Sequence, residues 1–262
     1  MLAFAQSALG RASLTLLIAP CLAPALALGD EITMAFGEKI PPFCFPETNS
    51  GIELEVIGLA LGYRGHTLKP VYYPFARIPV AFKAHRVNAA MTDLGHDMAA
   101  VGAYYGDPAV FYNNVFISLK ERKLVIHTPA DLRGLSVLSF AGADKRYPEW
   151  LGPVRKAGHY FEQNDQSLQV LTLDIGHYDV VLSDSNIFKY FTMLVSQNKS
   201  VPLKPVEEHG FVNFDPMDYR PVFWDKKYRD DFNVGLKHIR ENGRYEAIYR
   251  KYLGNDAMPK PK

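Results

Sequence analysis

The sequence is poor in cysteine and carries almost no net charge. Its 262 residues include two cysteines, 29 lysines and arginines, and 28 aspartates and glutamates, so the formal net charge is +1. Two cysteines cannot form the disulfide framework of a small secreted scaffold. A balanced charge provides no strong field for nucleic acid or an anionic membrane. We therefore expect no nucleic-acid partner.

Several motifs of well-defined chemistry are also missing. The chain contains no dinucleotide-binding G-x-G-x-x-G, no phosphate-binding Walker loop, no zinc-ligand spacing and no G-x-S-x-G nucleophile elbow. Because these motifs are missing, we expect no cofactor and no metal ion. Hydrophobic residues make up 48% of the chain and charged residues 22%, which is typical of a globular protein with a substantial core. The length predicts about two domains.

The first residues differ from the rest of the chain. Residues 1–29 contain no Asp or Glu and one Arg, and an apolar run over residues 14–28 leads to the small-residue motif Ala25-Leu26-Ala27. This pattern is typical of a secretory signal peptide over residues 1–27, and it predicts a periplasmic protein. The apolar run is shorter than a membrane-spanning helix needs, although an uncleaved anchor is an alternative.

Cys21 raises a second alternative, a lipoprotein signal. Lipoprotein signals have a small residue before the cysteine, and this chain has Pro20 there, so we expect simple secretion. Removal of the signal leaves Cys44 between two phenylalanines, where we expect a buried, unreactive thiol.

Hydrophobic periodicity predicts two successive β-α-β-α-β units, which indicates helices wrapped around parallel sheets. In the first unit we expect strands at 31–36, 68–73 and 87–92 and helices at 51–62 and 78–84. A long apolar strand is expected at 112–119, between the units. In the second unit we expect strands at 135–140, 160–162 and 178–183 and helices at 150–156, 166–174 and 186–194. The last part predicts a strand at 219–224, helices at 228–241 and 245–253, and a frayed tail at 257–262.

Short motifs in a fixed order point to a family. They are Pro41-Pro42-Phe43, Gly51-Ile52-Glu53-Leu54, Tyr73-Pro74-Phe75-Ala76-Arg77-Ile78, Ala130-Asp131-Leu132-Arg133-Gly134, the strand Tyr178 to Asp184, Asn242-Gly243-Arg244-Tyr245 and Lys251-Tyr252-Leu253-Gly254. Over residues 31–254 the sequence resembles the periplasmic, or extracellular, solute-binding proteins of family 3, the polar-amino-acid type that serves ABC transporters.

The resemblance implies an α/β fold of the two-lobed periplasmic-binding-protein type (type II), with the chain crossing between the lobes twice. The crossings are expected near 112–119 and 211–224. Lobe 1 should comprise residues 28–117 and 218–256, and lobe 2 residues 118–217. A ligand would bind between the lobes, at the carboxyl ends of the strands.

The resemblance also implies ligand-binding residues. Asp184 matches the acid that holds a ligand ammonium, although an Asp at this place is also a good helix N-cap. Phe75 matches an aromatic residue on which the ligand stacks. Expected neighbours in the cleft are Glu38, Phe43, Asp93 and Phe140. An acid with aromatic faces suits an ammonium group.

Two departures from the family pattern concern the ligand carboxylate. The backbone N–H groups around Gly142 and Ala143 could take a carboxylate, but Ala143 replaces the usual hydroxyl residue. Ala100 stands where the family has a carboxylate-clamping arginine. Arg77 is the substitute we consider, with a surface charge as its alternative role. The sequence therefore favours an amine over a plain α-amino acid.

The expected function is capture of a small polar ligand, amino-acid-like or amine, for an ABC permease or a membrane sensor. We expect a monomer without enzymatic activity. One alternative is an exported enzyme on the same fold, dehydratase-like, for which Asp93 and His96 form the visible acid–base pair. Another is a scaffold that has lost its ligand.

Overall fold

The computed structural model describes residues 29–92, 95–197, 202–211 and 220–254. The predicted signal peptide, Cys21, Asp93 and the tail at 257–262 lie outside the described residues, as does most of the predicted second crossing. Among the helices described, none is long and apolar enough to cross a membrane.

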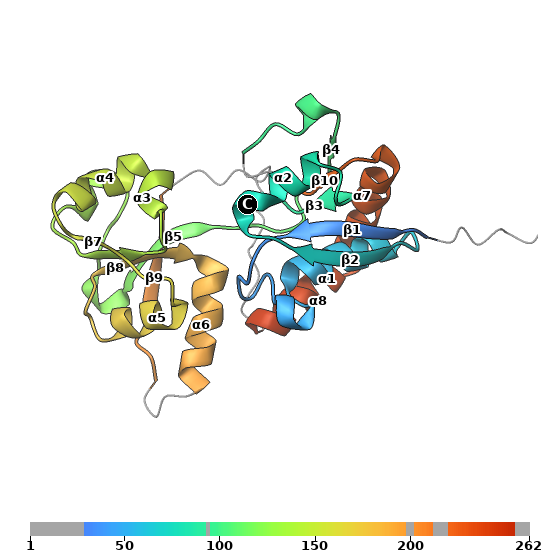
Figure 1. Ribbon diagram of the computed structural model, residues 1–262. Helices are drawn as coiled ribbons and strands as arrows, with labels where there is room; N and C mark the ends of the chain where they lie inside the picture. The colour runs from blue at the N-terminus through green and yellow to red at the C-terminus, as the bar shows by residue number, and fades with distance from the viewer. Residues whose placement is uncertain (1–28, 93–94, 198–201, 212–219, 255–262) are drawn as a thin grey trace, which may run out of the picture.

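The described strands form two five-stranded sheets, one in each of two lobes (Figure 1). The first sheet has the order β2-β1-β3-β10-β4. Its strands are β1 (Glu31–Phe36), β2 (Thr67–Tyr72), β3 (Ala89–Ala90), β4 (Tyr104–Tyr105) and β10 (Val222–Phe223). The second sheet has the order β7-β6-β8-β5-β9. Its strands are β5 (Asn114–Leu119), β6 (Val137–Ser139), β7 (Tyr160–Glu162), β8 (Val180–Asp184) and β9 (Val206–Gly210).

The helices cover both faces of each sheet. In the first lobe they are α1 (Ile52–Gly62), α2 (Ile78–Lys83), α7 (Lys226–Glu241) and α8 (Arg244–Leu253). In the second lobe they are α3 (Ala143–Arg146), α4 (Pro148–Lys156), α5 (Gln166–Asp174) and α6 (Ser185–Gln197). Helix α7 packs on α1 and α8 in the first lobe, as the predicted topology requires.

Side-chain alternation along β1 builds the core of the first lobe. Ile32, Met34 and Phe36 point to one face and pack with α1, α7 and α8, whereas Ala35 points to the other face with α2. Successive residues of a strand face opposite sides of its sheet, so one strand supplies both cores.

Strand β5, an interior strand of the second sheet, follows the same rule. Val115, Ile117 and Leu119 of β5 pack with α5 and α6, and Phe116 packs on the opposite face with α4. The strand is nearly all apolar because both faces are covered. The expected boundary between residues 117 and 118 falls inside β5, which pairs with β8 and β9.

The predicted parallel arrangement is confirmed for β1 with β2 and β3, and for β6 with β7 and β8. The first sheet gains antiparallel β10 between β3 and β4, and in the second sheet β5 runs antiparallel to both its neighbours. The expected strand over 87–92 is reduced to two residues in β3. Strands β4 and β9 had no sequence signal, because the first has two residues and the second reads Val-Glu-Glu-His-Gly.

The lobes also touch along α6. Its residues Ile187, Tyr190 and Phe191 belong to the apolar cluster of the first lobe. The ring of Tyr190 meets that of Phe45 edge-on at 6.0 Å, and Phe45 stacks on Tyr252 of α8. One flank of the second lobe therefore rests on the first.

Candidate functional site

A cavity of about 550 Å³ lies between the lobes. Its lining includes Gly37 after β1, Phe75 after β2, Thr92 after β3, Phe140 after β6, Asn164 after β7 and Asp184 at the end of β8. All of these strands belong to the parallel parts of the two sheets. Their carboxyl ends therefore converge on one cleft, which is the position where open α/β sheets bind ligands.

Asp184 is a buried carboxylate in this lining, with 3% of its surface exposed. Its Oδ1 accepts the backbone N–H of Ile187 at 2.9 Å, and its Oδ2 accepts that of Asn113 at 2.5 Å. The first bond makes Asp184 the N-cap of α6, the alternative role that the sequence left open. Both roles are compatible, because two carboxylate oxygens can accept about four hydrogen bonds.

Burial controls the charge of Asp184. Removal from water raises its pKa to about 7, against the opposing effect of the backbone N–H donors. A positive group beside the carboxylate would favour the ionised form and be attracted more strongly than in water.

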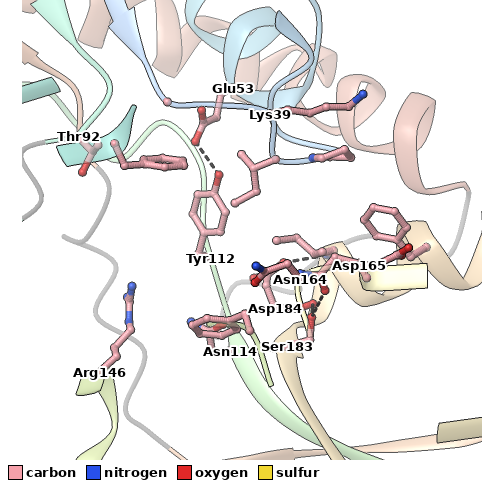
Figure 2. A pocket seen from close by; sticks show the side chains of 18 of the residues that line it. Lys39, Glu53, Thr92, Tyr112, Asn114, Arg146, Asn164, Asp165, Ser183 and Asp184 are labelled. Atoms are coloured by element: carbon pink, nitrogen blue, oxygen red, sulfur yellow. Dashed lines mark hydrogen bonds between the residues drawn. The ribbon is translucent and has the colours of Figure 1, made fainter. Parts of the chain in front are cut away.

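Glu53 is a second buried acid in the cleft, and it comes from α1 of the first lobe. Its Oε1 accepts the Tyr112 hydroxyl at 2.8 Å, the contact at the top of the view in Figure 2. Burial raises the pKa of Glu53 to about 7, and the hydroxyl bond partly offsets this.

Phe75 lies on the rim of the cleft with 38% of its surface exposed. It packs so closely over Gly37 that a Cβ on Gly37 would lie 2.1 Å from the ring carbon Cε1. Glycine at position 37 thus allows the ring to cover the end of β1 and to present one face to the cleft.

Polar groups concentrate on the wall formed by the second lobe. Figure 2 shows Asn164, Asp165, Ser183 and Asp184 gathered together there. Asp165 is the N-cap of α5 and accepts the backbone N–H groups of Ser167 and Leu168 at 2.9 and 3.2 Å. These oxygens make the wall rich in acceptors, which suits a ligand that donates hydrogen bonds.

Two cationic side chains are found among the described residues of the lining, Lys39 and Arg146. Lys39 forms an exposed ion pair with Glu47 at 3.1 Å. Arg146 ends α3 and lies apart from the acceptor-rich group in Figure 2. Arg77, the expected substitute clamp, is exposed at the start of α2 and is not part of the lining.

The structure brings Phe75, Phe140 and Asp184 together at the cavity. Glu38 is exposed outside the lining, between the lining residues Gly37 and Lys39. Phe43 is fully buried behind the cleft, where its ring lies 4.2 Å from that of Tyr112. The resemblance implied a place for Phe43 in the cleft, whereas its ring packs into the apolar core of the first lobe.

The expected backbone site for a carboxylate is engaged within the protein. The N–H of Gly142 donates to Glu162 Oε1 at 2.9 Å, and that of Ala143 donates to the Phe140 carbonyl at 3.3 Å. Ala143 is fully buried in the second lobe. Neither amide is directed to a ligand in this arrangement.

Sequence reasoning missed Glu53, Asn114 and Arg146 as cleft residues, whereas Tyr112 was among the aromatic residues expected near the cleft. Glu53 could have been noticed, because it is one of two acids, with Glu55, in the first turn of a helix that is apolar after that turn. Asn114 carried no signal beyond its place near the start of a strand. Among the described residues there is no cluster of three or more potential metal ligands.

No protein-family model matches the chain, and no curated protein sequence matches it. Solved structures do match. The second substrate-binding domain of GlnP from Lactococcus lactis, in an open conformation, is 20% identical over 87% of this chain and 97% of its own, with a TM-score of 0.59. The unliganded, open L-cystine solute receptor of Neisseria gonorrhoeae is 12% identical over 90% of this chain and 98% of its own, with a TM-score of 0.65.

An ancestral cationic amino acid solute-binding protein is 14% identical over 87% of this chain and 97% of its own, with a TM-score of 0.63. At these identities the likeness concerns the fold. It confirms the predicted architecture: the chain has the two-lobed α/β fold of type II periplasmic binding proteins.

Proposed function

We propose that this protein captures a small polar ligand, an amino acid or an amine, between its two lobes. The observation that carries the proposal is the buried carboxylate of Asp184, at the carboxyl end of β8, in a cavity shared by both lobes. Similar structures include a substrate-binding domain, an L-cystine receptor and a cationic amino acid binder, and they support the same class of ligand.

The ligand we favour is an amine whose ammonium group binds Asp184 and whose body contacts Phe75. Both residues belong to the lining, whereas Arg77 does not. Ala100, at the place of the family's carboxylate clamp, is also outside the lining. A bidentate arginine contact is among the strongest that a carboxylate can make, so its loss at this family position disfavours ligands that depend on it. Arg146 is the arginine that remains in the described lining.

The ligand is then handed to an ABC permease or a membrane sensor. The fold and the transporter components among similar structures support this step. We further propose that the chain is exported by the signal pattern in residues 1–27 and works in the periplasm as a monomer.

We favour binding over catalysis. A dehydratase would need an acid–base pair at the ligand, and His96, one member of the pair considered above, is exposed and outside the lining. The buried acids of the cleft, Glu53 and Asp184, accept hydrogen bonds from the protein itself. Such fixed acceptors suit recognition.

A thermal-shift screen over amino acids, amines and carboxylates tests this function. A ligand at 100 times its Kd stabilises the folded protein by about 2.7 kcal/mol, which is readily measured. We expect amines to raise the melting temperature most. If no compound of the three classes raises it, the protein is a scaffold that has lost its ligand. If a stabilising compound is chemically altered after incubation, the protein is an enzyme.

A further inference from the structure

The first crossing between the lobes passes through three residues, Tyr112, Asn113 and Asn114. Tyr112 contacts residues of the first lobe, and Asn113 and Asn114 contact residues of the second. Ala109 and Val110, just before them, are fully buried in the core of the first lobe. Asn114 begins β5 and is paired in register with Asp184 in the second sheet.

Tyr112 is held by the first lobe. Its ring lies 4.2 Å from the buried ring of Phe43, with an interplanar angle of 33°. Its hydroxyl donates to Glu53 Oε1 at 2.8 Å, and Glu53 is fixed in the first turn of α1. Ring and hydroxyl are thus attached to two different parts of the first lobe.

Asn113 is held by the second lobe through its backbone. Its N–H donates to Asp184 Oδ2 at 2.5 Å, and its carbonyl accepts the N–H of Ser185 at 2.9 Å. The next residue, Asn114, donates from Nδ2 to the Tyr147 hydroxyl at 2.9 Å. The Asn113 side chain itself is exposed.

Between these two sets of contacts lies one rotatable bond, ψ of Tyr112, because the Asn113 N–H that Asp184 holds is part of the planar Tyr112–Asn113 peptide group. We propose that the Tyr112–Asn113 link is the pivot of the first crossing, and that Glu53 is a positioning residue that keeps rotation there by fixing Tyr112 to the first lobe. When the lobes move, the contacts on either side are preserved and the change in dihedral angles is concentrated at this link.

The position of the pivot has a consequence that rests on the proposed function. Asp184, the group assigned to the ligand ammonium, is also the acceptor that holds Asn113. A ligand at Asp184 therefore contacts the carboxylate that holds the peptide group next to the rotating bond, so capture and lobe movement share one carboxylate.

The test measures the separation of the lobes without any ligand, so its result does not depend on the proposed function. Nitroxide labels are placed at Lys83→Cys in α2 and Lys156→Cys in α4, two exposed positions in different lobes, in a Cys21→Ser background. Cys44 is fully buried, and burial raises its thiol pKa to about 12, so it does not compete for the label. Pulsed electron paramagnetic resonance gives the distribution of distances.

Tyr112→Phe keeps the ring on Phe43 and removes the hydroxyl. We expect it to broaden the distance distribution and to accelerate amide exchange over residues 109–113 about fivefold, a factor that corresponds to about 1 kcal/mol for one hydrogen bond. Glu53→Leu, which removes the acceptor, should match it. Glu53→Gln keeps an oxygen acceptor and should retain the parent distribution.

Tyr72→Phe is the matched control. It removes another tyrosine hydrogen bond of the first lobe, in which the Tyr72 hydroxyl, on the edge strand β2, donates to Asn49 Oδ1 at 2.9 Å. If the Tyr112 bond had only a general structural role, Tyr72→Phe would broaden the distribution as much as Tyr112→Phe does. That result, or an unchanged distribution in Tyr112→Phe, overturns the proposal.

Discussion

Asp184 Oδ2 lies 2.5 Å from the backbone nitrogen of Asn113, and Asp184 Oδ1 lies 2.9 Å from that of Ile187. One carboxylate thus joins the end of β8, the first turn of α6 and the crossing segment. It is buried, yet it belongs to the lining of the interlobe cavity. A ligand cation at this group would meet an acid that is already oriented, so little ordering remains to be done on binding.

The two buried acids of the cleft should make stability depend on pH. Burial raises the pKa of Glu53 from 4.5 and that of Asp184 from 3.8, in both cases to about 7. Each folded-state pKa is above its unfolded value, so the folded state binds more protons in this interval and its stability falls as pH rises from about 4 to about 7.

Urea unfolding at several pH values across this interval measures the effect. Glu53→Gln and Asp184→Asn should each flatten the fall, because each removes one of the titrating groups. Acids whose pKa is lowered, such as Asp179 and Asp231, act in the opposite direction, and their contribution is lost only below their ordinary values. An equal slope in the parent and both variants would contradict the assignment.

Gly37→Ala should weaken ligand binding with little loss of stability. Its Cβ would lie 2.1 Å from Phe75 Cε1, and the ring is 38% exposed, so it can move away rather than strain the core. Loss of an aromatic contact is worth about 0.5–1.5 kcal/mol, so we expect a Kd raised about two- to twelvefold by calorimetry.

Gly210→Ala is its control, because an added Cβ there has nothing within 4 Å. If Gly37→Ala binds an amine that stabilises the parent protein with unchanged affinity, Phe75 does not contact the ligand.

Gly235→Ala should destabilise the first lobe. A Cβ at this position in α7 would lie 1.8 Å from the carbonyl oxygen of Ala60 in α1, so the two helices approach through their backbones. Separating them costs about 1–3 kcal/mol of the free energy of unfolding, as other overpacked cores do. Gly152→Ala, within α4 and with open space around it, should instead be neutral or stabilising by up to about 1 kcal/mol. Urea unfolding of the two variants separates these effects, and equal stabilities would contradict the close approach.

The sequence predicts the fold well where hydrophobic periodicity is long. Strand β1, strand β7 and helix α5 have the predicted bounds. Strand β3 was predicted too long. Met91 and Thr92, the two residues that follow it, line the cavity and lie outside the strand. Strand β9 pairs through its backbone while carrying charged side chains, and such pairing leaves no periodic signal.

The candidate site was predicted where a residue follows directly from a strand end. Phe140 and Asp184 are of this kind, because the carboxyl ends of parallel strands fix their place. Residues on longer connections were harder to predict. Phe43 and Arg77 lie in such segments, and packing decides their direction in ways that no local pattern encodes. Glu53 and Tyr112 meet across 59 positions of sequence, a contact that only the tertiary structure makes.

Calorimetry of Asp184→Asn and Arg77→Ala, with an amine that stabilises the parent protein, tests the central claim most directly. Asn keeps the size of the side chain and removes its charge, so we predict that Asp184→Asn raises the Kd at least about tenfold, or about 1.4 kcal/mol. Arg77 is exposed outside the lining, so Arg77→Ala should change the Kd far less. Melting curves of both variants establish that they remain folded. Loss of binding in Arg77→Ala with unchanged binding in Asp184→Asn would contradict the claim and identify the ligand as an anion held elsewhere.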